Sequence, residues 1–549
     1  MRGLNGCIAL LLVVSCGGET GTADSAAAGE KVRLFDGLGA LHRDVGTRNE
    51  EAQRYFDQGL RLSYAFNHAE AVRSFREAQR LDPSCAMCWW GEALALGPNI
   101  NAAMDSASGV AAYAALRQAM ALSARAGEVD RGLIDALSKR YSAVPLAARA
   151  SLDSAYAGAM GVLARAHPGD DEVLVLHAES LMDLSPWDYW VDRDVAKPNG
   201  AEAIASLETV LARSPDHPGA CHFYIHAVEA MQPRKAIECA ERLPSLMPAA
   251  GHIVHMPGHI YIRVGRYADA VERNVHATHA DEAILADLAP DGVYRLSYYP
   301  HNYHFLSFAA DMAGMSAVAL EAANNTAAAV DTTLLRVPEL ASMQHYRVMP
   351  LYTAVRFGHW DEILASPQPP ADLAYMQGVW HFARGMAFAR TDRVSEAEAE
   401  LKALSASRSD STITSLRIWG INAAVSLLEI AEDVVAGEIA ASSKDWAAAE
   451  RSLRSAVRRE DALTYDEPPT WQIPVRHHLG AVLLAAGRPA AAEVAYREDL
   501  DRFPDNGWSL VGLQQSLSAQ GKQAEADSVK ARLAEVWATS DLTLTASRF

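Results

Sequence analysis

Residues 480–504 read GAVLLAAGRPAAAEVAYREDLDRFP. Small residues stand at Gly480 and Ala492, and the aromatic Tyr496 follows Ala492 by about one helical turn. A Gly-Arg-Pro turn interrupts the stretch, and Pro504 ends it. Alanine, leucine and glutamate favour helices, whereas glycine and proline end them. The stretch therefore predicts two helices joined by a tight turn, with small residues where the helices pack closely.

The same spacing recurs elsewhere in the chain. Near the N-terminal end, Gly59, Ala71 and Phe75 precede Asp82-Pro83 at matching intervals. A further copy lies 34 residues beyond the first stretch, and weaker copies stand between the two ends. The residues that mark these copies are Leu517, Gly521, Ala526 and Leu533; Gly258, Gly265 and Ala270; Gly385 and Ala397; and Gly437, Ala449, Leu453 and Ala456.

These spacings resemble the tetratricopeptide repeat (TPR), in which a small residue lets two helices pack closely. The resemblance covers most of residues 50–537. It implies an all-α fold, a right-handed solenoid of roughly 10 to 12 TPR-like helical hairpins that each bury an apolar face against their neighbours. We expect degenerate hairpins with a His-rich concave groove over residues 36–365, and more regular TPR repeats over residues 366–549.

The composition narrows the class of protein further. Half of the 549 residues are apolar and 21% are charged, which excludes a disordered or low-complexity chain. The formal net charge is −19, so we expect no nucleic-acid partner. No Gly-rich phosphate loop, no nucleophile elbow and no HExxH metalloprotease motif occurs in the sequence.

The N-terminus carries an export signal. One positive charge precedes the apolar run from Cys7 to Val14, and small residues lead to Cys16. This pattern resembles a bacterial lipoprotein signal, which implies a signal peptide over residues 1–15 and lipidation of Cys16; a plain signal peptide is the alternative. We predict a flexible tether over residues 16–35 and a lipid anchor in the outer membrane, facing the periplasm or the cell surface.

Histidines gather in one part of the chain. Ten of the 19 lie between His217 and His304, which is about a sixth of the length. In TPR arrays, the first helix of each hairpin lines the concave groove, and the small packing residues set which positions face it. If the resemblance holds, up to nine imidazoles face the groove. They are His177, His222, His226, His252, His255, His259, His301, His304 and His345.

Metal coordination is the chemistry that suits this pattern. Pairs such as His222/His226 and His301/His304 are three or four residues apart, so both rings of a pair can reach one ion. Imidazole suits copper, zinc, iron and nickel alike. Glu229 and Asp311 are candidate carboxylate ligands, bases or partners that orient an imidazole.

Three functions follow from this reading. The first is a cell-envelope binding protein that holds a protein, peptide or small-molecule ligand in the groove, with a transition-metal ion as part of the site. The second is a metal-dependent enzyme, an oxidoreductase or hydrolase, built on the same solenoid. The third is a metal-free scaffold for protein–protein interaction.

Four cysteines follow the signal. Cys221 and Cys239 fall on the two antiparallel helices of one expected hairpin, so we predict a disulfide between them. Cys85 and Cys88 have the spacing of a redox motif, but no thioredoxin-like strand pattern surrounds them, and a redox role is not the favoured interpretation.

Overall fold

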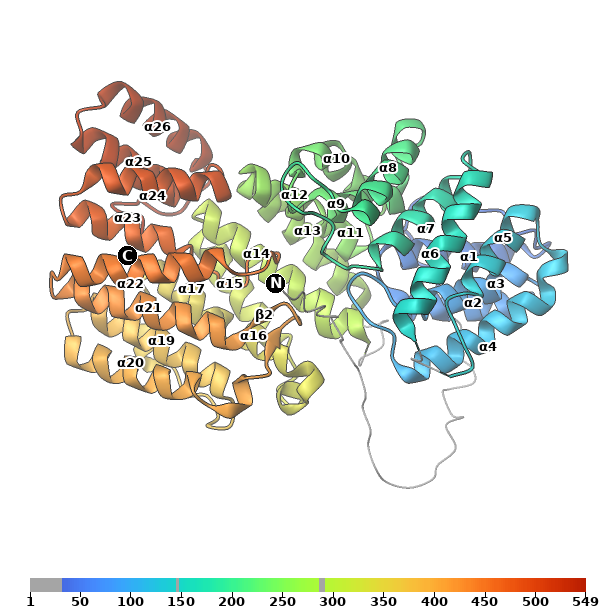
Figure 1. Ribbon diagram of the computed structural model, residues 1–549, viewed down its shortest axis with the longest axis horizontal. Helices are drawn as coiled ribbons and strands as arrows, with labels where there is room; N and C mark the ends of the chain where they lie inside the picture. The colour runs from blue at the N-terminus through green and yellow to red at the C-terminus, as the bar shows by residue number, and fades with distance from the viewer. Residues whose placement is uncertain (1–31, 145–147, 286–291) are drawn as a thin grey trace. The chain divides into compact units, whose positions relative to one another are not determined.

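The computed structural model describes residues 32–144, 148–285 and 292–549. The predicted signal peptide, Cys16 and most of the predicted tether lie outside these residues and stay predictions. The described chain is almost entirely helical (Figure 1). Two short strands in it, β1 (Arg417–Ile418) and β2 (Asn422–Ala423), pair antiparallel.

The chain forms two compact units. Among the described residues, the N-terminal unit comprises 32–144, 148–257, 279–285 and 292–295, and the C-terminal unit comprises 258–278 and 296–549. Each is described separately below. The predicted boundary between residues 365 and 366 stays a prediction.

The N-terminal unit contains α-helices of 5 to 18 residues and two shorter 3-10 helices, joined mostly by short turns. They are α1 (Glu50–Tyr64), α2 (His68–Leu81), α3 (Ala86–Ala95), α4 (Ser106–Leu122), η1 (Ser123–Arg125), α5 (Glu128–Leu137), α6 (Arg149–Ala166), α7 (Asp171–Met182), α8 (Pro198–Arg213), α9 (Pro218–Val228), η2 (Pro233–Ala236), α10 (Ile237–Leu246) and α11 (Gly251–His255).

The C-terminal unit begins with α12 (Pro257–Val264) from its second residue onward and most of α13 (Tyr267–Ile284). Pro257, the last turns of α13 and residues 294–295 of the next helix belong to the N-terminal unit. It continues with η4 (Tyr294–Tyr298), α14 (Tyr299–Ala313), α15 (Ser316–Ala328), η5 (Leu334–Arg336), η6 (Pro338–Met343), α16 (Gln344–Arg347), α17 (Met349–Phe357), α18 (Trp360–Ala365), α19 (Ala374–Arg390), α20 (Val394–Arg408), η7 (Ser411–Ile413), α21 (Ala424–Ser442), α22 (Trp446–Asp461), α23 (Val475–Ala485), α24 (Pro489–Arg502), α25 (Gly507–Ala519) and α26 (Gln523–Val536).

At the C-terminal end, one aromatic side chain packs between three successive helices. Tyr496 of α24 lies against both Gly480 of α23 and Gly512 of α25, and a Cβ atom on either glycine would overlap its ring. Glycine is required at both positions because the ring occupies the space that any side chain would need.

The same arrangement occurs near the other end of the chain. Phe75 of α2 fills the space over Gly59 of α1 and Gly91 of α3, and a Cβ atom on either glycine would again overlap the ring. The glycine–aromatic–glycine contact thus recurs in both units at identical spacing. The predicted all-α, TPR-type fold is confirmed by this packing.

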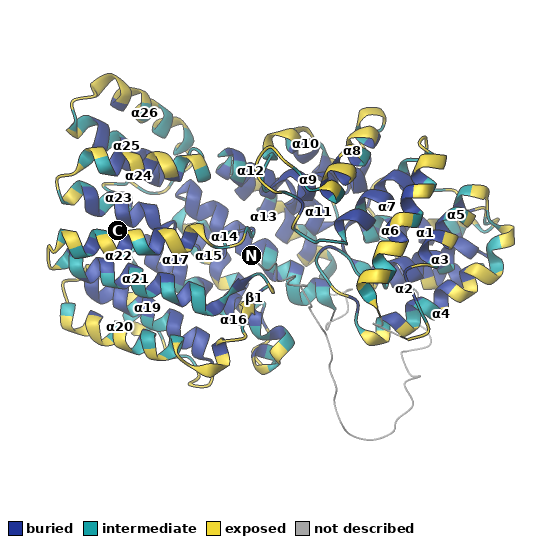
Figure 2. Ribbon diagram, viewed as in Figure 1, coloured by how far each residue is buried: buried dark blue, intermediate teal, exposed yellow. Residues whose placement is uncertain are grey.

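The two helices of a hairpin differ in burial (Figure 2). In the pair α19 and α20, the first helix is buried along nearly its whole length, whereas the second buries only Ala397 and Leu404. The pair α25 and α26 shows the same contrast, because Ala526 is the buried residue of α26. The predicted groove histidines are buried as well, except His301, which is half-buried.

No helix in the described part of the chain is both long enough and apolar enough to cross a bilayer.

Candidate metal centre

Helix α9 supplies the first two imidazoles of the candidate centre. Pro218 opens the helix, and the side chain of His217 caps it by accepting the backbone N–H of Ala220 at 3.1 Å. Every residue of α9 is buried. His222 and His226 are four residues apart, and their Nε2 atoms lie 3.1 Å from each other.

Contacts on the far side of each ring fix these two imidazoles. Nδ1 of His222 lies 2.6 Å from the backbone carbonyl oxygen of Tyr64, so it carries the proton and donates. The lone pair of His222 is therefore on Nε2, which faces His226. Nδ1 of His226 lies 3.6 Å from Oε2 of the buried Glu229. A partner on Nδ1 that leaves Nε2 for the ion is the usual arrangement around metal-binding histidines.

His252 of α11 supplies the third imidazole. Ligand atoms of His222, His226 and His252 all lie within 4.8 Å of one another. The start of α11 is held in place, because the backbone N–H of His252 donates to the hydroxyl of Tyr294 at 2.9 Å, and that hydroxyl donates to Asp281 at 2.6 Å.

Two aromatic side chains enclose the cluster. Phe66, in the turn between α1 and α2, has its ring centroid 4.5 Å from His222 and 5.4 Å from His252. Trp187 lies edge-on to His226 at 5.0 Å. Both have a positive φ, 55° for Phe66 and 64° for Trp187, which is rare for bulky residues and costs roughly 1–3 kcal/mol. The fold holds two strained aromatic residues against the same imidazoles.

The geometry of this cluster is close to what a metal ion requires. Two nitrogens bound tetrahedrally at about 2.0–2.1 Å would be about 3.3 Å apart, and the observed separation of the two Nε2 atoms is 3.1 Å. Three imidazoles leave one position of a tetrahedral ion open for water or a ligand. The N-terminal unit thus contains a preformed three-histidine set.

His255 is the last residue of α11, and α12 begins two residues later at Pro257, which lacks the N–H that would continue the helix. The sequence spacing predicts His252, His255 and His259 on one helical face, and this grouping stays a prediction. His255 is fully buried in the N-terminal unit, with its ring centroid 5.8 Å from that of His252.

The predicted ligands His259 and His301 belong to the C-terminal unit. Nδ1 of His259 lies 3.1 Å from Oε2 of the buried Glu467, and Arg263 lies 3.7 Å from the other carboxylate oxygen. The rings of His259 and His301 are 6.0 Å apart. Glu467 therefore orients His259.

His304 and His345 form a separate pair in the C-terminal unit. Their ring centroids are 5.7 Å apart in an edge-on arrangement. Nε2 of His304 accepts the side-chain amide N–H of Gln472 at 2.8 Å, and Nδ1 of His345 lies 2.7 Å from the hydroxyl of Tyr375. Burial lowers the pKa of His304 to about 3 and holds the pKa of His345 well below its usual value. Both imidazoles are neutral near pH 7.

Acid is expected to destabilise the C-terminal unit through this pair. Below pH 6.5, the unfolded chain binds protons that the folded His304 rejects down to its pKa of about 3. As the pH is lowered through this range, the free energy of unfolding therefore decreases by about 1.4 kcal/mol per pH unit for such a residue. Denaturant unfolding at several pH values below 6.5 measures this slope. A His304→Asn variant is expected to show a shallower slope, and equal slopes for variant and parent would contradict the assignment.

Two other predicted residues lie apart from the imidazole clusters. His177 packs beside α8, with Nδ1 3.4 Å from the Ser206 hydroxyl and Nε2 3.7 Å from Glu202. Asp311 forms a buried ion pair with Arg356 at 2.6 Å. Each is already engaged by the neighbouring helix, so the structure does not place either among the metal ligands.

The cysteines are arranged differently from the expectation. Cys85 and Cys88 form a disulfide. Cys221 and Cys239 are free, with their Sγ atoms 2.8 Å apart on α9 and α10. The two thiols are therefore close together, and their pairing in the oxidised protein stays a prediction.

Sequence reasoning missed several residues of these sites. Phe66 follows α1 in a turn with no distinguishing pattern, and only its contacts reveal it. Trp187, Glu467 and Gln472 lie in Pro- and Asp-rich segments that interrupt the repeats. Each of these segments lies beside a helix that carries histidines. Because functional side chains concentrate on loops, the segments were the sequence signal for residues that contact the imidazoles.

The chain is weakly similar in structure to several solved proteins. No protein-family model and no curated protein sequence matches the chain. Among solved structures, the human IFIT1 dimer with m7Gppp-AAAA is 11% identical, with a TM-score of 0.31 over 90% of this chain and 91% of that chain. Yeast Tom70 is 11% identical, with a TM-score of 0.27 over 89% and 93%. The TPR domain of P58(IPK) is 10% identical, with a TM-score of 0.21 over 86% and 98%. The fold assignment rests on the helix packing of this chain.

Proposed function

We propose that this chain is a cell-envelope binding protein whose N-terminal unit holds a transition-metal ion on His222, His226 and His252. One observation carries the proposal: the two Nε2 atoms of His222 and His226 face each other at 3.1 Å, while the Tyr64 carbonyl fixes the proton of His222 on Nδ1. The bound ion then provides the position at which a protein, peptide or small molecule attaches to the scaffold.

Metal binding requires one proton shift in this cluster. In the empty site, Nε2 of His222 accepts, so Nε2 of His226 carries a proton. Binding of the ion displaces that proton, and Nδ1 of His226 can take it, because the Glu229 carboxylate lies 3.6 Å away. Neutral nitrogen ligands suit copper, zinc, iron and nickel.

A metal-dependent enzyme, an oxidoreductase or hydrolase, is the second candidate function. The observation that favours it is the number of ligands, since three protein ligands leave a position for water or substrate. In the cobalt-substituted protein, an open position is expected to give a visible spectrum that changes when azide is added. A spectrum insensitive to azide indicates a closed binding site.

Export to an oxidising compartment is part of the proposal. The lipoprotein-like sequence before Cys16 supports it, and so does a disulfide in the described chain, since disulfides persist outside the cytosol. Anchoring in the outer membrane rests on the sequence pattern alone.

Metal content of the exported protein tests the proposal. Plasma mass spectrometry is expected to find about one metal ion per chain, because one three-histidine site binds one ion. Copper, zinc, iron or nickel each support the proposal. If none of the four metals is found, either in the purified protein or after incubation with each ion, the proposal is wrong and the chain is a metal-free scaffold.

A further inference from the structure

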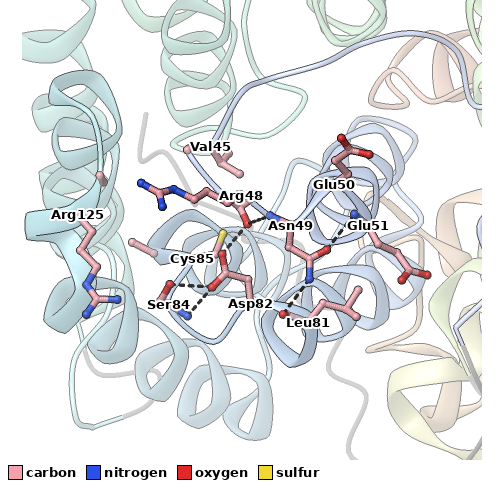
Figure 3. A pocket seen from close by; sticks show the side chains of 14 residues that line it. Val45, Arg48, Asn49, Glu50, Glu51, Leu81, Asp82, Ser84, Cys85 and Arg125 are labelled. Atoms are coloured by element: carbon pink, nitrogen blue, oxygen red, sulfur yellow. Dashed lines mark hydrogen bonds between the residues drawn. The ribbon is translucent and has the colours of Figure 1, made fainter.

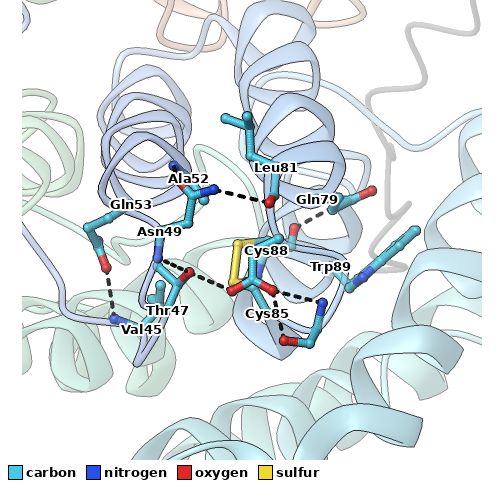
Figure 4. Close-up of a disulfide and its surroundings, with 12 residues drawn as sticks. Val45, Thr47, Asn49, Ala52, Gln53, Gln79, Leu81, Cys85, Cys88 and Trp89 are labelled. Carbon is cyan, nitrogen blue, oxygen red and sulfur yellow. Dashed lines mark hydrogen bonds between the residues drawn. A yellow bond between two sulfur atoms is a disulfide. The ribbon is translucent and has the colours of Figure 1, made fainter.

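A disulfide stands at the start of helix α3, outside the histidine cluster (Figure 4). Cys85 is the N-cap residue of α3 and Cys88 lies in its first turn. A disulfide between residues so close in sequence closes only a short loop, so its restriction of the unfolded chain is smaller than that of a longer loop. The disulfide therefore adds little to the free energy of unfolding, and a role in exchange chemistry is worth considering.

Both cysteines are buried, but only Cys85 lines a pocket at the surface. Cys85 lines a surface pocket of about 940 Å³, which α1, α3 and the segments before them enclose (Figure 3). Cys88 is fully buried and does not line this pocket. Of the two cysteines, Cys85 is therefore the one nearer to a thiol that enters the pocket.

The backbone around Cys85 favours a thiolate there once the disulfide opens. The backbone N–H of Cys88 points at Sγ of Cys85 at 3.1 Å. The positive end of the helix dipole acts in the same direction, since Cys85 is the N-cap. Both effects stabilise negative charge on Cys85, which favours its departure in the second exchange step, when the mixed disulfide is resolved.

Charged groups of both signs line the pocket. The cations are Arg48 and Arg125, and the anions are Glu50, Glu51 and Asp82. Asp82 is engaged by the hydroxyl of Thr47 at 2.5 Å and that of Ser84 at 2.7 Å. With nearly balanced charge, the pocket suits a neutral dithiol.

We propose that Cys85–Cys88 is a redox-active pair that exchanges with a dithiol in this pocket. A thiolate of the dithiol attacks Sγ of Cys85, a mixed disulfide forms, and Cys88 leaves as a thiolate that takes a proton. The second thiol of the reagent then attacks its own sulfur in the mixed disulfide and releases Cys85. Two electrons pass to the protein, which becomes a dithiol, and the reagent becomes a cyclic disulfide.

The test uses the full chain with Cys7, Cys16, Cys221 and Cys239 each replaced by serine, so that this pair alone remains. Millimolar dithiothreitol at pH 7, without denaturant, is expected to reduce the pair and to yield one oxidised dithiothreitol per chain. Circular dichroism before and after reduction reports whether the fold persists. Reduction that occurs only above the unfolding midpoint overturns the proposal and leaves a structural disulfide.

Single-cysteine versions of this chain test the roles of the two sulfurs. With Cys88→Ala added, Cys85 is expected to react with iodoacetamide at least about tenfold faster than Cys88 does in the matched Cys85→Ala version. Equal rates in two folded variants would overturn the assignment of Cys85 as the attacked sulfur.

Discussion

Replacing His226 with alanine is expected to lower metal affinity by about 100-fold or more. Loss of a partner that merely orients a ligand costs about 10–100-fold, and loss of the ligand itself costs at least as much. The effect is large here because His226 contributes one of the three imidazoles of the cluster. Isothermal titration of the metal-free protein with zinc measures the change, and competition with a chelator extends the range.

A matched variant separates loss of a ligand from loss of packing. His177→Ala removes another buried imidazole of the same unit, one that lies beside Ser206 rather than in the cluster. We expect zinc affinity to stay within about twofold of the parent, since no ligand or orienting contact is lost. Equal losses in the two variants would show that the three-histidine set is not the site.

Much of the fold could be predicted from a few residues at fixed spacing. Gly59 with Phe75, and Gly480 with Tyr496, are visible as pairs at fixed spacing, and the structure places each pair in contact. The third member of each contact, Gly91 or Gly512, is harder to predict because it belongs to the following helix. Its role depends on how adjacent hairpins stack, which is a property of tertiary packing.

The candidate site is only partly readable. The i, i+4 pair His222/His226 lies on one face because helix geometry demands it, and the structure confirms that the rings meet. The predicted grouping of His252, His255 and His259 on one face stays a prediction, since α11 ends at His255 and α12 begins at Pro257. Burial by Phe66 was unpredictable, because its ring reaches the imidazoles from a turn far away in sequence. Local periodicity fixes the face of a helix, whereas the residues that cover that face come from elsewhere in the chain.

A buried polar network in the C-terminal unit holds Asp311, which the sequence offers as a candidate carboxylate ligand or base. Arg356 donates to Asp311 at 2.6 Å and to Nδ1 of His477 at 2.8 Å, and its guanidinium lies 3.7 Å from the ring centroid of Trp508. Nε2 of His477 in turn donates to Asp499 at 2.9 Å. Burial raises the pKa of Asp311 to about 6, and the charge of Arg356 opposes that rise. The guanidinium is thus the cation on which this network depends.

Arg356→Met is therefore expected to lower the free energy of unfolding by about 3–5 kcal/mol, the usual cost of removing one partner of a buried ion pair. The side chain keeps its approximate volume, so the loss comes from the charge left on Asp311. Denaturant unfolding followed by circular dichroism measures it. Adding Asp311→Asn should recover part of the loss, because the stranded charge is then gone. Arg336→Met, which breaks an exposed pair with Asp372, serves as the control and should leave the unfolding midpoint unchanged. If Arg356→Met behaves like this control, the buried network does not stabilise the unit, and Asp311 becomes available for another role.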